Sequence, residues 1–246
     1  MLRLVGLALA LTAGAAGSAA AVETRWLTLT SAPTAVDLYA PSAAPRGLAV
    51  VAHGFTRSRT RHAVLARRLA EAGFLVAVPD LPHWARHGAN ADAIVALVDS
   101  IASTRGLGPL PVVLVGTSAG GLATLLASDR VPRLALWIGL DPVDAFGDAT
   151  DAARRLRAPA VVLRAPGSAC NAAGSARRIA ASLPDGHVER RIDGASHCDF
   201  EDTTNWRCEW ICGDADAARQ ALIVDETVEA ARGAIALPEI RSPAPD

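Results

Sequence analysis

The sequence contains no lysine, and aromatic residues make up only 4% of its 246 residues. All 24 basic residues are therefore arginines, which form fixed, bidentate ion pairs more readily than lysines do. They are balanced by 25 acidic residues, and the formal net charge of −1 gives no electrostatic basis for binding nucleic acid or an acidic membrane. So few aromatic rings also leave no broad stacking platform for a ligand.

The leucine-rich stretch at the N-terminus is shorter than the roughly 20 residues that a membrane-spanning helix needs. It has instead the parts of a secretory signal, with a positive Arg3, an apolar stretch over 4–11 and small residues at 17–21. We predict a signal peptide over residues 1–22, one domain over 23–237 and a flexible tail over 238–246. The mature protein is expected to be secreted or periplasmic, without a stable membrane anchor.

Cysteine is also scarce, with only four residues, Cys170, Cys198, Cys208 and Cys212. In an exported protein, an even number of cysteines favours two disulfides over free thiols. Four cysteines allow three pairings, and their spacing alone does not choose among them.

Short apolar runs alternate with amphipathic segments along most of the chain. We predict strands over residues 26–30, 35–39, 47–52, 74–78, 111–115, 134–140, 158–163 and 188–192. We predict helices over residues 62–72, 89–104, 175–183 and 215–236, and another directly after residue 118. Several of the strands are apolar throughout, as expected of strands buried on both faces. The alternation predicts an α/β fold with a doubly wound, mostly parallel sheet flanked by helices and no large lid domain.

The segment VVLVGTSAGG, residues 112–121, passes from a predicted buried strand directly into small residues. Residues 116–120 fit the pattern G-x-S-x-G, between a strand and a helix, where a nucleophile elbow is found. In such an elbow a strained serine exposes its hydroxyl, and the flanking glycines let the strand and helix approach closely. We therefore interpret Ser118 as a nucleophile. The alternative is a structural turn with a capping serine.

A serine hydroxyl needs a base to take up its proton. His197 directly follows the last of the predicted strands, near the edge of the sheet where the elbow lies, and is the candidate base. Of the other histidines, His62 is expected on the surface of a helix, His187 in a polar turn, and His83 and His87 in a loop. Because only a neutral imidazole can accept a proton, we expect activity to fall in acid.

The base in turn needs a carboxylate that orients it. The commonest place, the loop after the strand at 158–163, contains no carboxylate. Asp141 lies at the carboxyl end of the preceding strand, in the correct chain order, and is our candidate, with Asp144 as the runner-up. The acidic residues that follow the candidate base are interpreted as a solvated loop cluster or a local cap: Asp199, Glu201 and Asp202.

An acyl-transfer site also needs two backbone N–H groups that face the developing oxyanion. Ala119, directly after the nucleophile, is expected to supply one of them. Phe55, in the HGF segment after the strand at 47–52, is expected to supply the other. His53 is expected to brace this loop by hydrogen bonding and to take no chemical part. The alternative is that HGF forms an ordinary strand-to-helix turn.

The sequence gives little support for a metal site or a nucleotide-binding site. His83 and His87 are four residues apart, a spacing that can bind zinc on a helix, but no HExxH glutamate or nearby cysteine accompanies them. The glycine-rich turn at 116–121 lacks both G-x-G-x-x-G and a Walker lysine, which disfavours a nucleotide. We expect neither a metal nor a cofactor.

Five segments, in chain order, resemble those of α/β hydrolases: AVVAHGF, VAVPD, VGTSAGG, IGLDPVD and GASHCDF. GLDPVD is similar to the element of chlorophyllases and their bacterial relatives in which the acid follows this same strand, consistent with Asp141. Plant chlorophyllases typically carry arginine after the serine, where this chain has Ala119, so pigment specificity does not transfer. Secreted dienelactone-hydrolase-like and cutinase-like esterases are similar at the same motifs but usually place the acid one strand later.

The resemblance implies a serine hydrolase that cleaves a small-molecule carboxylic ester through an acyl-enzyme, with Ser118, Asp141 and His197 as its triad. In this fold the loop that holds Cys170 lies beside the base, which implies the disulfides Cys170–Cys198 and Cys208–Cys212. The competing pairing bonds Cys198 into residues 208–212. The alternative function is a catalytically silent, hydrolase-like binding or partner protein in the periplasm.

Overall fold

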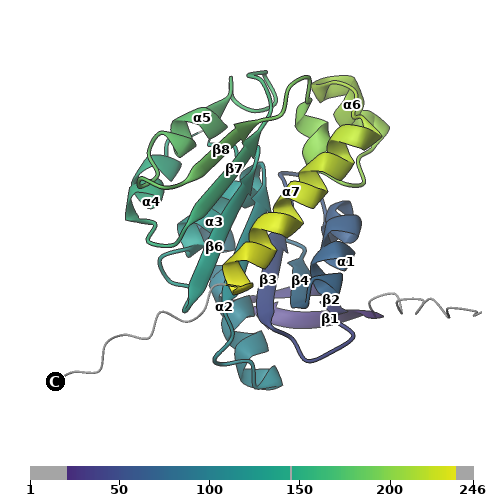
Figure 1. Cartoon of the computed structure of the whole chain (residues 1–246), viewed down its shortest axis with the longest axis vertical. Coiled ribbons are helices and arrows are strands. Elements are labelled where there is room, and N and C mark those ends of the chain that lie inside the picture. The colour runs from purple at the N-terminus through teal and green to yellow at the C-terminus, as the bar shows by residue number, and fades with distance from the viewer. Residues whose placement is uncertain (1–20, 145, 237–246) are drawn as a thin grey trace, which may run out of the picture.

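The structure is a computed structural model that describes residues 21–144 and 146–236. Its eight strands form one sheet in the order β1-β2-β4-β3-β5-β6-β7-β8 (Figure 1). They are β1 (Ala21–Leu29), β2 (Ala32–Ala40), β3 (Gly47–Ala52), β4 (Phe74–Pro79), β5 (Val112–Thr117), β6 (Leu134–Leu140), β7 (Ala160–Arg164) and β8 (Val188–Arg191). Every pair from β4 to β8 is parallel, and the two antiparallel pairs are β1–β2 and β2–β4. The predicted mostly parallel α/β sheet is confirmed.

Helices cover both faces of the sheet (Figure 1). One face packs against α2 (His87–Arg105), α3 (Ala119–Ala127), α4 (Ala149–Arg155) and α5 (Ser175–Ala180). The other packs against α1 (Ala63–Glu71), α7 (Ala217–Ala236) and the short 3-10 helix η2 (His197–Phe200). Alternate residues of the central strands enter the two cores: Leu114 faces one and Val115 the other, and both are fully buried. This explains why the sequence of β5 is apolar at every position.

The first two strands are longer than predicted. They form a hairpin in which Ala21 pairs with Ala40, and its turn contains Thr30 with a positive φ of 58°. The predicted signal segment lies outside the described residues apart from Ala21 and Val22, which are part of β1, and the predicted tail lies outside them altogether. Both remain predictions. None of the described helices combines the length and the apolar character needed to cross a membrane.

Two helices, α4 and α6 (Trp206–Cys212), were not predicted. Both contain only seven residues: α6 has no buried residue, and α4 buries only alanines, which give a weak apolar signal in the sequence. A further 3-10 turn, η1 (Arg59–His62), precedes α1. The loops after β3, β5, β6 and β7 all leave the carboxyl edge of the sheet, where ligands of open α/β sheets bind.

Candidate active site

Ser118 occupies the sharp turn between β5 and α3, with φ 55° and ψ −122°. This region of backbone space is strained for a residue other than glycine. The turn is secured on both sides: the Ser118 amide donates to the Leu140 carbonyl at 3.0 Å, and the Ser118 carbonyl accepts from the Val143 amide at 3.0 Å. The strain is therefore held in place by hydrogen bonds to the segment that follows β6.

Small residues are required around this turn. A Cβ atom built on Gly116 would lie 2.3 Å from the Gly120 carbonyl oxygen, and one on Gly120 would lie 2.4 Å from the Ala52 carbonyl oxygen. A Cβ on Gly121 would lie 2.6 Å from the side chain of Pro142. These contacts explain why the apolar run of β5 passes directly into glycine and alanine.

Asp141 and His197 are in direct contact. The imidazole Nδ1 lies 2.7 Å from Oδ2 of the Asp141 carboxylate. Asp141 directly follows β6, has a φ of 41° and is completely buried, whereas the His197 side chain is 12% exposed. The loop that carries His197 is tied to the elbow, because the Thr117 hydroxyl donates to the Phe200 carbonyl at 3.3 Å.

Asp144, the runner-up for the acid, has a different role. Its carboxylate accepts hydrogen bonds from backbone amides that lead into α4, including those of Gly147 at 2.8 Å and Ala149 at 3.0 Å. Such bonds satisfy amides that the helix leaves without a partner. Of the two carboxylates, only Asp141 contacts His197 within the described part of the chain.

The two amides expected at the oxyanion hole belong to the loop after β3 and to the first residue of α3. Among the described residues, neither the Phe55 nor the Ala119 N–H donates a hydrogen bond, so both are free to bind an oxyanion. The loop of Phe55 packs on the elbow, since a Cβ on Gly54 would lie 3.1 Å from Ser118 Cβ. His53 braces this loop: its Nδ1 contacts the Gly54 carbonyl at 2.7 Å, and its Nε2 accepts from the Leu81 amide at 2.9 Å.

Ser118 and His197 open onto one cleft of about 640 Å³. The Ser118 hydroxyl makes no hydrogen bond to the imidazole in the residues that the structure describes, as is common when no substrate is bound. The walls of the cleft are the loop after β3 and helix α6. Arg57 joins these walls, because its guanidinium binds the Glu201 carboxylate through two hydrogen bonds and Asn205 Oδ1 through one of 3.3 Å.

Two disulfides hold α6 in place, Cys170–Cys212 and Cys198–Cys208. The pairing implied by the resemblance, Cys170–Cys198 with Cys208–Cys212, is therefore wrong, and Cys198 follows the competing arrangement. The reason is α6 itself. Residues four apart on a helix have Cβ atoms about 5–6 Å apart, whereas a disulfide needs about 4 Å, so Cys208 and Cys212 bond to different partners.

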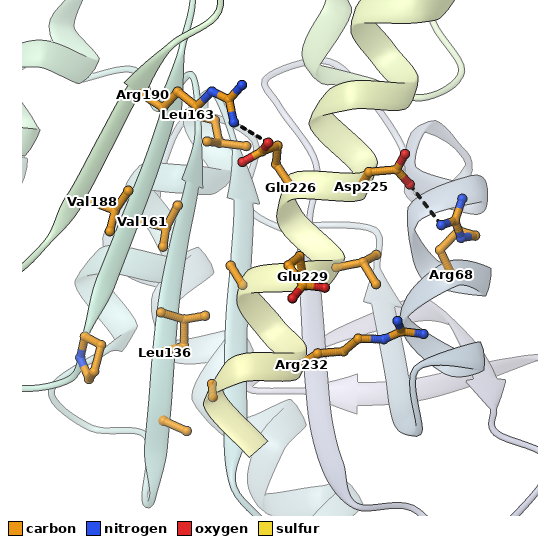
Figure 2. Close-up of a pocket in the computed structure, with 15 residues that line it drawn as sticks. Arg68, Leu136, Val161, Leu163, Val188, Arg190, Asp225, Glu226, Glu229 and Arg232 are labelled. Carbon is orange, nitrogen blue, oxygen red and sulfur yellow. Dashed lines mark hydrogen bonds and ion pairs between the residues drawn. The ribbon is translucent and has the colours of Figure 1, made fainter. Parts of the chain in front are cut away.

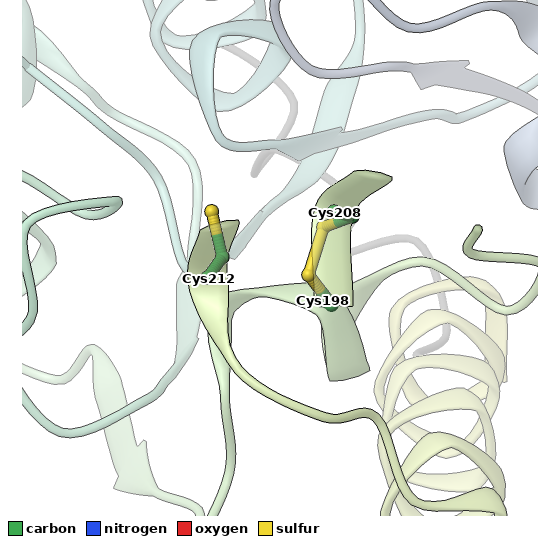
Figure 3. Close-up of side chains that lie close together, drawn as sticks. All are labelled: Cys198, Cys208 and Cys212. Atoms are coloured by element: carbon green, nitrogen blue, oxygen red, sulfur yellow. A yellow bond between two sulfur atoms is a disulfide. The ribbon is translucent and has the colours of Figure 1, made fainter. Parts of the chain in front are cut away.

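The sulfur atoms of Cys198, Cys208 and Cys212 lie within 4.8 Å of one another (Figure 3). This spacing resembles that of a metal site, but all three atoms belong to disulfides. A disulfide sulfur is not the thiolate that a metal requires. The cluster is therefore a structural clamp beside the cleft.

The prediction that His62 lies on a helix surface is wrong. The residue belongs to η1, one position before α1 begins, and its side chain is buried against Leu65 and Phe200. Its Nε2 atom has no hydrogen-bond partner among the described residues, and burial lowers the pKa of His62 to about 3. Burial also lowers the pKa of His53. Both rings are therefore neutral near pH 7.

The acidic residues after His197 are not solvated. The predicted local cap is correct for Asp199, which forms a reciprocal capping box with Ser196 and also accepts from Arg219 Nε at 2.8 Å. Glu201 is buried in its ion pair with Arg57, and burial raises the pKa of Asp202. The sequence pattern suggested a solvated loop because the arginines that pair with these carboxylates, Arg57 and Arg219, lie elsewhere along the chain.

Asn171 is a residue of the site that the sequence analysis missed. It lies in the loop after β7, is completely buried and donates a hydrogen bond to Asp141. That loop contains no carboxylate, the group that orients the base in a triad. An isolated asparagine in the loop where the acid of related folds usually lies was the available signal.

A second hollow, of about 730 Å³, lies where α7 crosses β6, β7 and β8 (Figure 2). Its floor is apolar, and the ion pairs Arg68–Asp225 and Arg190–Glu226 lie at its edges. None of the described residues that line it is a serine, cysteine or histidine. Although this hollow is the larger, Ser118 and His197 open onto the smaller cleft.

At the level of sequence, no family model and no curated protein matches this chain. Its structure is similar to that of dienelactone hydrolase from Anabaena variabilis ATCC 29413, with a TM-score of 0.70 and 18% identity over 86% of this chain and 97% of the other. It is also similar to the esterase domain of a Rhodothermus marinus protein, with a TM-score of 0.67 and 16% identity over 87% of this chain and 99% of the other. The chain therefore has the α/β-hydrolase fold, in a form similar to that of dienelactone hydrolase.

Proposed function

We propose that this protein is a serine hydrolase that cleaves carboxylic esters through an acyl-enzyme intermediate. The observation that carries the proposal is the partly buried contact between Asp141 and His197 beside a partly exposed serine elbow that opens onto the same cleft as His197. The similar structures of a dienelactone hydrolase and an esterase domain agree with this class of reaction.

In this mechanism the Asp141 carboxylate can only accept a hydrogen bond, so the His197 Nδ1 atom carries the hydrogen. The lone pair of Nε2 is then available to take the proton of the Ser118 hydroxyl as its oxygen attacks the ester carbonyl. The Phe55 and Ala119 amides stabilise the oxyanion. The protonated imidazole gives its proton to the departing alcohol, and water releases the acid by the same steps.

The cleft carries more positive than negative side chains. Arg57, Arg61 and Arg207 line it, whereas Glu201 is its one acidic lining residue within the described chain. Glu201 neutralises Arg57, and the remaining two guanidiniums favour esters whose acid or alcohol part carries negative charge or strong hydrogen-bond acceptors. We propose a small-molecule ester as the substrate, and a secreted or periplasmic location consistent with the two disulfides.

A fluorophosphonate probe tests the proposal directly, because it reacts with activated serines. We expect the folded wild-type protein to be labelled and the Ser118→Ala and His197→Ala variants to remain unlabelled. A series of p-nitrophenyl esters of increasing chain length then reports turnover and acyl preference. A folded wild-type protein without labelling or turnover would favour the alternative function, a catalytically silent binding or partner protein.

A further inference from the structure

Asp141 is a carboxylate without access to water, and its charge therefore depends on hydrogen-bond donors in the protein. His197 supplies one donor, to Oδ2, and the Ala165 amide supplies another, to Oδ1 at 3.2 Å. The third donor is the side-chain amide of Asn171, which lies 3.1 Å from Oδ2 and 3.5 Å from Oδ1. Asn171 thus donates mainly to Oδ2, the carboxylate oxygen that the imidazole also contacts.

The orientation of the Asn171 amide is determined by its other partners. Its Oδ1 accepts from the backbone amides of Ser168 and Gly174, both at 2.8 Å. Its Nδ2 donates a second hydrogen bond, to the Pro166 carbonyl at 2.9 Å. A flipped amide would place a donor against two N–H groups and an acceptor against a carbonyl. Only asparagine in this orientation satisfies all of these partners.

The loop around Asn171 is rigidly held. Ala172, Ala173 and Gly174 all have positive φ values, of 49°, 55° and 80°, so the chain wraps around the asparagine side chain. The preceding residue, Cys170, is bonded to Cys212 in α6. The amide therefore presents its other hydrogen atom to Asp141 from a fixed position.

We propose that Asn171 is a positioning residue of the catalytic site, which acts through Asp141 on His197. Its donated hydrogen bond stabilises the buried carboxylate and keeps it rotated so that Oδ2 faces Nδ1 of the imidazole. This inference rests on the proposed function. The remaining charged side chains of the cleft make no hydrogen bond to Asp141 or Asn171 among the described residues: Arg57, Arg61, Glu201 and Arg207.

The proposal requires a hydrogen-bond donor at position 171. Asparagine provides one, whereas an ionised aspartate can only accept. In Asn171→Asp two carboxyl groups would face each other in a buried site, where both cannot remain ionised. In Asn171→Ala the donor is removed and the carboxylate is left to rotate. We expect either change to lower kcat about 10- to 100-fold through loss of alignment, with KM within about twofold of wild type. We also expect the acidic limb of the kcat/KM profile to shift.

The matched control is Asn90→Ala. Asn90 is likewise buried, and its side chain also bonds backbone groups, accepting from the His83 amide and donating to the Trp84 carbonyl. It has no contact with Asp141 or His197 among the described residues. We expect this variant to lose stability but to keep the wild-type kcat and pH profile.

Turnover of p-nitrophenyl esters between pH 5 and 9 tests the inference, together with unfolding in urea. A proton NMR spectrum adds a readout that does not depend on turnover: the downfield resonance of the His197 Nδ1 hydrogen should move in both Asn171 variants and stay in place in Asn90→Ala. If either Asn171 variant folds and keeps the wild-type kcat, profile and resonance, Asn171 is merely structural. If wild-type protein itself shows no turnover, the proposed function fails instead, and the resonance alone decides the role of Asn171.

Discussion

His197 Nδ1 lies 2.7 Å from Asp141 Oδ2, although 56 residues separate the two positions in the chain. They follow β8 and β6, two strands that are separated in the sheet by β7. Because all three strands are parallel, their carboxyl ends share one edge, and the loops that leave it converge. Because a carboxylate can only accept a hydrogen bond, the contact places the hydrogen on Nδ1 and leaves the lone pair of Nε2 available to another group.

This relationship separates the two candidate acids. Asp141→Asn would offer the imidazole an amide in place of the carboxylate and favour the wrong tautomer, so we expect kcat to fall by a factor on the order of 10⁴. Asp144→Asn weakens the cap of α4 and should cost about 1 kcal/mol of unfolding free energy with kcat retained. Ester turnover and urea unfolding of both variants check this. Loss of turnover in Asp144→Asn alone would make Asp144 the acid.

The close packing of the elbow predicts a strong effect of one methyl group. In Gly120→Ala the added Cβ would lie 2.4 Å from the carbonyl oxygens of Ala52 and His53, which are backbone atoms and cannot rotate away. We expect a loss of about 1–3 kcal/mol in unfolding free energy and a lower kcat, since the displaced segment leads into Phe55.

Gly88→Ala is the control for this change. Gly88 is also helical, and no atom lies within 4 Å of a Cβ built there. The substitution should be neutral or stabilise the protein by up to about 1 kcal/mol. Thermal unfolding and turnover of both variants compare the two sites, and equal effects would contradict the close approach of β3 and α3.

The two disulfides should contribute differently to stability. They join residues 42 and 10 positions apart, so removal of Cys170–Cys212 or Cys198–Cys208 by paired serine substitutions should cost about 4 and about 3 kcal/mol, respectively, from chain entropy. Urea unfolding measures both losses. Peptide mapping without reduction checks the pairing itself, and a Cys170–Cys198 peptide would contradict the structure.

Buried His62 predicts a pH dependence of stability. The unfolded state binds a proton below pH 6.5, whereas the folded state binds it only near pH 3, because burial lowers the pKa of His62. The unfolding free energy should therefore fall by about 1.4 kcal/mol for each pH unit between these values as the solution is acidified. His53, whose pKa is also lowered by burial, contributes in the same direction.

His62→Leu removes the contribution of His62 to the pH dependence of the unfolding free energy. We expect its unfolding free energy at pH 7 to be equal to that of wild type or higher, since Nε2 has no hydrogen-bond partner among the described residues, and its decline in acid to be shallower. His187→Gln, at the surface, is the matched control and should retain the wild-type slope. Urea unfolding between pH 4 and 7 measures the slopes. Parallel curves for wild type and His62→Leu would show that His62 is accessible to water.

The strands were predictable because burial on both faces requires an uninterrupted apolar run, as in β3 and β5. The elbow was predictable for a related reason: only glycine fits where Gly120 meets the Ala52 carbonyl, and that requirement is written into the local sequence. Helix α6 has no such signature. It buries none of its residues and is held by disulfides, so its pattern resembled a loop.

The same distinction, between what neighbours along the chain determine and what distant partners determine, applies to the burial of charged side chains. Glu201 and Asp199 are polar in sequence and lie in a short acidic cluster, which predicts exposure. Arg57 and Arg219 reach them from 144 and 20 positions away and allow their burial. No local pattern encodes a partner at that distance.

The sequence by itself determined the alternation of strands and helices, the turn at Ser118 and the chain order of serine, acid and histidine, because each depends on neighbours along the chain. The tertiary structure decided which carboxylate meets His197, how the cysteines pair and which polar side chains are buried. Those outcomes depend on the distances between loops at the carboxyl edge of the sheet. Such distances are properties of packing, since parallel strands bring together segments that the sequence keeps apart.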